Sequence, residues 1–106
     1  MSYPEALREL ERELDRVVDR LTSMPLARAE SAARDCRQAA LVIVEQTRLL
    51  TDEIPADAAV PGLGPQGLGA MLAVLGTDYL AAVRRVPDAD LSAVKGALVT
   101  LRRALP

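Results

Sequence analysis

Apolar residues recur at alternating steps of three and four along the first quarter of the chain. The series comprises Leu7, Leu10, Leu14, Val17, Leu21 and Met24. Most residues between them are charged, so this spacing places the apolar side chains on one stripe of an amphipathic helix. Ser2 and Glu5 have the spacing of a capping box, and Pro25 stops helical growth. We therefore expect a helix over residues 3–23.

A second series with the same spacing predicts a longer helix over residues 26–52. It comprises Ala29, Ala33, Cys36, Ala40, Ile43, Thr47, Leu50 and Ile54. The first half of this series is built of small side chains, which let two helix backbones approach closely. We expect that half to lie tightly against the first helix, in an antiparallel hairpin with a very short turn.

Two further helices are expected in the second half of the chain, over residues 66–86 and 89–105. Their apolar series are Leu68, Leu72, Leu75, Tyr79, Ala82 and Val86, then Leu91, Val94, Leu98, Leu101 and Leu105. The Pro- and Gly-rich residues 53–65 predict an irregular connection before them, and Asp88 or Asp90 suits the cap of the last helix. The sequence thus predicts an all-α, four-helix bundle of two helical hairpins joined by a long loop, which also allows a crossover or a swapped dimer.

Composition agrees with a single helical domain. The chain has 106 residues, half of them hydrophobic, with no Phe or Trp, so the core must be built from Leu, Val, Ala and Met. Interleaved charges give a net charge of −2 and no basic stripe, which argues against a nucleic-acid partner. The N-terminus does not resemble a signal peptide, so we expect a cytoplasmic protein; the preference for Arg over Lys suggests a high-GC bacterium.

Two stretches are more apolar than a bundle requires. Residues 39–44 are apolar around the whole helix, and the start of the third helix is similar. The prolines and glycines in the uncharged residues 58–77 argue against a membrane-spanning helix. Contiguous exposed apolar surface marks interaction sites, so we expect a homo-oligomeric or other helical protein interface on the second and third helices. The predicted interface is centred on Leu41, Val42, Val44, Met71 and Val74.

Two alternatives remain open for these apolar stretches. In the first, the 53–66 segment folds back and covers them within one protomer. In the second, the bundle binds a small apolar ligand beneath this segment, which would act as a lid. The ligand pocket would then be formed by Leu63, Leu68, Met71, Thr77 and Tyr79.

The sequence offers little for catalysis, and we expect no enzyme activity, cofactor or metal site. Histidine is absent, and Cys36 lies among alanines on a packing stripe, where a thiol is unreactive. Residues 62–67 spell a glycine-rich phosphate loop, but no strand precedes them. Arginines recur every four residues in the first helix with acids among them, which is typical of a solvated surface. They are Arg8, Arg12, Arg16 and Arg20.

Overall fold

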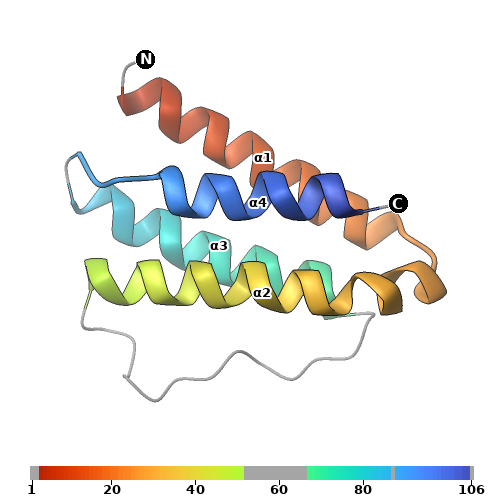
Figure 1. Ribbon diagram of the computed structural model, residues 1–106. Coiled ribbons are helices and arrows are strands. Elements are labelled where there is room, and N and C mark those ends of the chain that lie inside the picture. Colours follow the sequence, from red (N-terminus) through yellow and green to blue (C-terminus); the bar gives the residue numbers. More distant parts are fainter. Residues whose placement is uncertain (1–2, 52–66, 87, 106) are drawn as a thin grey trace.

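The protein is a four-helix bundle in a computed structural model, which describes residues 3–51, 67–86 and 88–105 (Figure 1). The helices are α1 (Tyr3–Ser23), α2 (Leu26–Leu50), α3 (Leu68–Arg84) and α4 (Ser92–Ala104), and the described residues contain no strand. The predicted all-α, four-helix class is confirmed, and α1 has the predicted bounds. The other three helices are shorter than predicted, by two residues or more.

Asp90 explains why α4 begins later than predicted. Its carboxylate accepts hydrogen bonds from the backbone N–H of Ser92, at 2.9 Å, and from the Ser92 hydroxyl, at 2.7 Å. These two hydrogen bonds lower the pKa of Asp90. Asp88 adopts a positive φ of 60°, a left-handed conformation that aspartate tolerates better than most residues. The turn therefore occupies residues up to Leu91, and the helix starts at Ser92.

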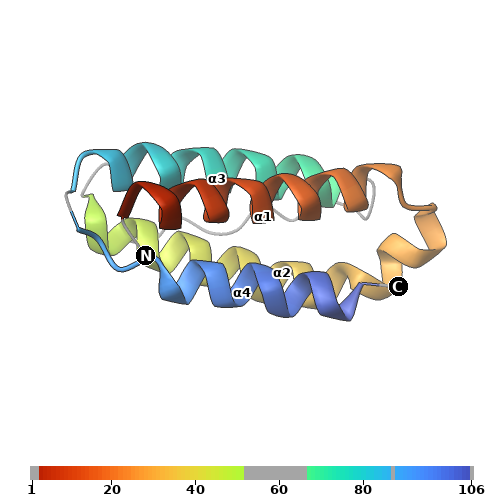
Figure 2. The ribbon, with the colours of Figure 1, turned by 90° about the horizontal axis from the view of Figure 1, so that it is seen from above.

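Each helix packs closely against two others, and the arrangement differs from the predicted hairpin packing. Helix α1 packs against α3 and α4, and α2 packs against the same two helices. Helices α1 and α2 therefore lie diagonally across the bundle, as Figure 2 shows. The expectation that the small residues of α2 lie tightly against α1 is wrong, because α3 and α4 lie between these helices.

The direction of the chain explains this arrangement. Helices α2 and α3 run the same way, as do α1 and α4, while α1–α3 and α2–α4 are antiparallel pairs (Figures 1 and 2). The end of α2 and the start of α3 thus lie at opposite ends of the bundle. A chain reversal after α2 would have made α2 and α3 antiparallel. The crossover that the sequence left open is the arrangement found.

The core lies along the centre of the bundle and receives side chains from every helix. The largest fully buried ones include Leu10, Ile43, Leu72, Tyr79, Leu98 and Leu101. Close approach of α1 and α3 depends on glycine: a β-carbon at Gly69 would meet Thr22 Oγ1, and one at Gly76 would overlap Leu14. None of the described helices has the length and apolar character needed to cross a bilayer.

Candidate functional site

The predicted interface residues fall into an exposed group and a buried group. Leu41 of α2 and Val74 of α3 keep 52% and 61% of their surface exposed, and Val42 is partly exposed. Val44 and Met71 are only 8% and 3% exposed and belong to the core. Their assignment to an exposed surface is therefore wrong, because a helix with neighbours on two sides buries more than its central stripe.

Leu41 and Val74 lie on the outer sides of neighbouring helices. Val42 lines a groove between α2 and α4, and Leu41 lies about 100° around the helix from it, on the side nearer α3. On α3, Gly76 faces α1, and Val74 lies about 200° around the helix from Gly76. Val74 is therefore turned away from α1, toward the α2 side. Leu41 and Val74 both flank the junction of α2 and α3.

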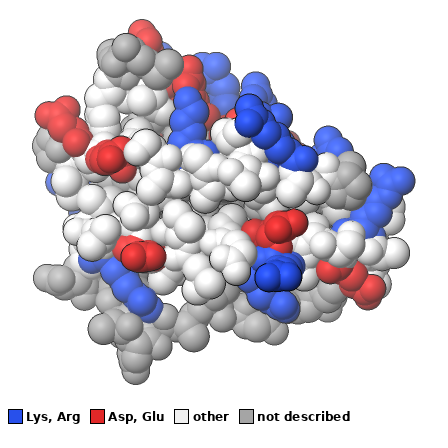
Figure 3. Space-filling model, in the orientation of Figure 1, with Lys and Arg blue, Asp and Glu red and all other residues white. Residues whose placement is uncertain are grey.

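A shallow groove of about 300 Å³ runs along the surface where α2 packs against α4. Its lining is mostly small or apolar and comprises Asp35, Gln38, Ala39, Val42, Gly96, Ala97, Thr100, Leu101 and Ala104. Figure 3 shows that the middle of this face is largely uncharged. A β-carbon at Gly96 would meet nothing within 4 Å, so this glycine contributes to the hollow. Val42 belongs to this groove. It is therefore separate from the surface formed by Leu41 and Val74, which we call the Leu41–Val74 surface.

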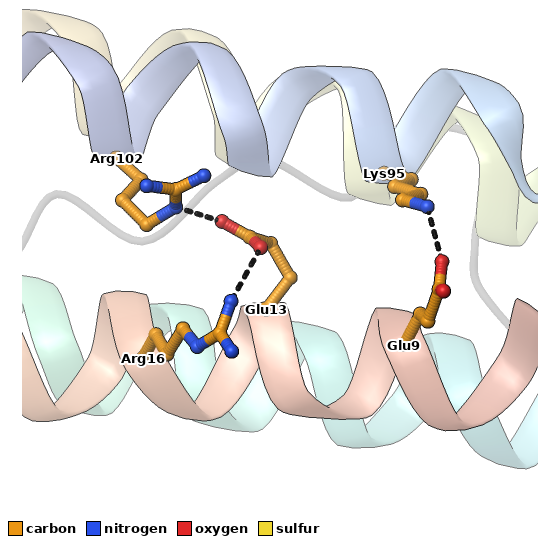
Figure 4. Close-up of polar contacts among 5 residues, drawn as sticks. All are labelled: Glu9, Glu13, Arg16, Lys95 and Arg102. Carbon is orange, nitrogen blue, oxygen red and sulfur yellow. Dashed lines mark hydrogen bonds and ion pairs between the residues drawn. The ribbon is translucent and has the colours of Figure 1, made fainter.

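The junction between α1 and α4 is instead highly charged (Figure 4). Glu13 accepts a hydrogen bond from Arg102 Nε and lies 3.6 Å from Arg16 Nη1, while Lys95 Nζ donates to Glu9 Oε2 at 2.6 Å. Glu13 is buried, and a buried carboxylate is costly unless it is paired. The two guanidinium groups compensate its charge. The hydrogen bond from Lys95 lowers the pKa of Glu9.

Sequence reasoning missed this charged junction. It interpreted Arg12 and Arg16 as part of a solvated row, because acids are interleaved with them in sequence. Lys95 and Arg102, the α4 partners of Glu9 and Glu13, are more than eighty residues away in sequence, so no local spacing could reveal these contacts. The available signal was the basic side of the last helix, where Lys95, Arg102 and Arg103 recur at steps of seven and one.

The predicted ligand pocket is not assembled as expected. Leu68, Met71 and Tyr79 are buried in the core, whereas Thr77 is exposed and donates to Ala73 O within its own helix. Thr77 and Tyr79 lie about 200° apart around α3, so they cannot share the mouth of one cavity inside the bundle. Leu63, the predicted 53–65 loop and nearly all of the glycine-rich motif lie outside the described residues.

Two buried groups in the core, Cys36 and Tyr79, could ionise by losing a proton, but burial keeps both in their protonated, neutral forms. Burial, with a smaller effect from Asp35, raises the pKa of the Cys36 thiol to about 11. Burial also raises the pKa of Tyr79 to about 12, and its hydroxyl meets no hydrogen-bond partner among the described residues. A neutral thiol is a poor nucleophile and a poor metal ligand.

Comparisons with known proteins leave the function to be argued from this geometry. No protein-family model matches the chain, and no curated protein or solved structure shows significant similarity to it. Within residues 3–51, 67–86 and 88–105, no cluster of three or more acidic or cysteine side chains could hold a metal ion. Three surfaces therefore remain as candidates: the Leu41–Val74 surface, the α2–α4 groove and the charged α1–α4 junction.

Proposed function

We propose that the protein is a non-catalytic helical interaction module that pairs with a second copy of itself through the Leu41–Val74 surface. The observation that carries the proposal is the distribution of exposed large apolar side chains. Those of the described residues are Leu26, Leu41, Leu49 and Val74, all on α2 or α3. Burying exposed apolar surface contributes a favourable free energy of about 25 cal/mol per Å² of surface removed from water. Association through α2 and α3 is therefore favoured over association through α1 or α4.

The charges beside Leu41 favour a second copy as the partner. Arg37 and Glu45 are exposed and lie four residues before and after Leu41, about 6 Å away along the helix in each direction. Two α2 helices that cross antiparallel at Leu41 would place Arg37 of each copy beside Glu45 of the other. Such a twofold interface is self-complementary, with an apolar centre and opposite charges on its rim.

Sedimentation velocity on the purified chain, at protein concentrations from about 5 to about 500 µM, tests the proposal. We expect a dimer for the wild type. The double variant Leu41→Glu, Val74→Glu should associate about 100-fold more weakly, because each copy would bury two unpaired carboxylates in the interface. The matched control is Leu26→Glu, a substitution of an equally exposed leucine elsewhere on α2. It should leave the dimer intact.

A charge exchange tests the geometry of the pairing. Arg37→Glu should weaken the dimer, because each copy would then bring two carboxylates together, and adding Glu45→Arg should restore it. Circular dichroism checks that each variant remains helical. A wild-type monomer at 500 µM, or a dimer that survives the Leu41 and Val74 substitutions, would contradict the proposal.

A further inference from the structure

The charged junction between α1 and α4 is also a cleft. It encloses about 320 Å³ and is lined by Glu9, Arg12, Glu13, Arg16, Lys95, Val99, Arg102 and Arg103. In the view of Figure 3, Lys and Arg side chains gather along the upper edge of the molecule, over α1 and α4. The Leu41–Val74 surface lies at the junction of α2 and α3, across the bundle, so the two surfaces are separate.

The cleft has an excess of positive charge that its own ion pairs do not use. Five cationic and two acidic side chains line it, a formal charge of +3 in a chain whose net charge is −2. Glu9 is paired with Lys95, and Glu13 with Arg102 and Arg16. The charge of Arg12 also helps to lower the pKa of Glu9, but neither Arg12 nor Arg103 comes within ion-pair distance of a carboxylate in the described part of the chain.

We propose that this cleft binds a small anion that carries a diphosphate group. A diphosphate bears a charge of about −3 near neutral pH, which would balance the charge of the lining. One guanidinium group can also donate two parallel hydrogen bonds to two phosphate oxygens. The volume suits a small molecule and is at the lower end of the range for ligand sites. The cleft has no aromatic lining on which bases could stack, which disfavours single-stranded nucleic acid.

The two carboxylates give the cleft a fixed shape rather than competing for the ligand. Glu13 is buried and holds Arg102 and Arg16 on opposite sides of its carboxylate, as Figure 4 shows. Side chains held by such contacts lose little further entropy when a ligand binds. Arg12 and Arg103 then supply the unpaired donors.

Titration calorimetry with inorganic pyrophosphate, in a phosphate-free buffer of low ionic strength, tests the assignment. We expect saturable binding with one site per chain, and about tenfold weaker binding for Arg12→Gln and for Arg103→Gln. These variants retain every ion pair that joins α1 to α4, so both should fold. The matched control is Arg8→Gln, on α1 but outside the cleft lining, which should bind as the wild type does.

Two comparisons separate specific recognition from general attraction of anions. Orthophosphate should bind more weakly, because it offers fewer oxygens and less charge, and citrate of similar charge should also bind more weakly. No heat of binding at millimolar pyrophosphate would overturn the proposal. Equal binding of citrate would also overturn it, as would equal loss of affinity in Arg8→Gln and Arg12→Gln.

Discussion

Gly76 of α3 packs directly against the side chain of Leu14 of α1, with no room for a β-carbon between them. The Leu14 side chain is buried, so an added methyl group must either displace that side chain within the core or move α1 away from α3. Overpacking of a core costs about 1–3 kcal/mol, whereas alanine gains up to about 1 kcal/mol over glycine in a helix. We expect Gly76→Ala to lower the free energy of unfolding by about 1 kcal/mol, measured by urea denaturation.

Gly96 of α4 provides the opposite case in the same fold. A β-carbon there would meet nothing within 4 Å, so only the backbone effect of the substitution remains. We expect Gly96→Ala to raise the free energy of unfolding by about 0.5–1 kcal/mol. Equal changes in the two variants would show that the Leu14 side chain is not held against Gly76 in solution.

These glycines illustrate what the sequence could and could not predict. The period of apolar residues located all four helices, because an amphipathic stripe is a local property, and the capping-box spacing and Pro25 gave the bounds of α1. It could not identify the neighbour of each stripe, so α2 was paired with α1, while the glycines that let α3 approach α1 went unnoticed. Where every position is apolar, as in residues 39–44, the pattern also could not separate buried Val44 from exposed Leu41.

The charged cleft shows the same limit for function. The row of arginines in α1 could be recognised in the sequence. The excess positive charge of the cleft, however, depends on α4 lying beside α1 and running in the same direction. The side chains that complete the cleft come from residues 95–103. Only the three-dimensional register brings them opposite Glu9 and Glu13.

The pKa of Glu9 should report directly on its contact with Lys95. The hydrogen bond from Lys95 lowers this pKa below its ordinary value of 4.5. The contact therefore stabilises the fold above the ordinary carboxyl pKa and is lost as the pH falls through the lowered value. We expect Lys95→Met to raise the pKa of Glu9 toward 4.5, measured by NMR titration of the side-chain carboxyl carbon. Lys95→Arg should keep it low, and an unchanged pKa in Lys95→Met would show that the contact is not formed in solution.

The buried hydroxyl of Tyr79 should reduce stability. It meets no hydrogen-bond partner among the described residues, so folding removes it from water without replacing the lost hydrogen bonds. We expect Tyr79→Phe to stabilise the protein by about 1 kcal/mol, which corresponds to a rise in Tm of about 4–8 °C for a domain of this size. Thermal denaturation followed by circular dichroism measures this change.

Tyr3→Phe is the matched control for Tyr79→Phe. The Tyr3 hydroxyl donates to Val83 O at 3.4 Å, a long hydrogen bond that joins the start of α1 to the end of α3. Its removal should lower Tm slightly. A lower Tm in Tyr79→Phe as well would show that the Tyr79 hydroxyl is hydrogen-bonded in solution.

The buried thiol of Cys36 should make the fold sensitive to alkaline pH. Burial raises its pKa to about 11 from an ordinary value of 9.0, so the unfolded chain loses the thiol proton first as the pH rises. Stability is therefore complete below about pH 9 and falls between about pH 9 and 11, because ionisation then favours the unfolded state.

Cys36→Ala isolates this effect from the other groups that titrate at high pH. Urea denaturation of both proteins at intervals from neutral to strongly alkaline pH gives the difference in their free energies of unfolding. At neutral pH the wild type should be more stable, because alanine leaves a small gap in the core. That difference should shrink as the pH rises past 9, since only the wild type has a thiol that ionises on unfolding. A difference that stays constant up to pH 11 would mean that the native protein exposes the Cys36 thiol to water.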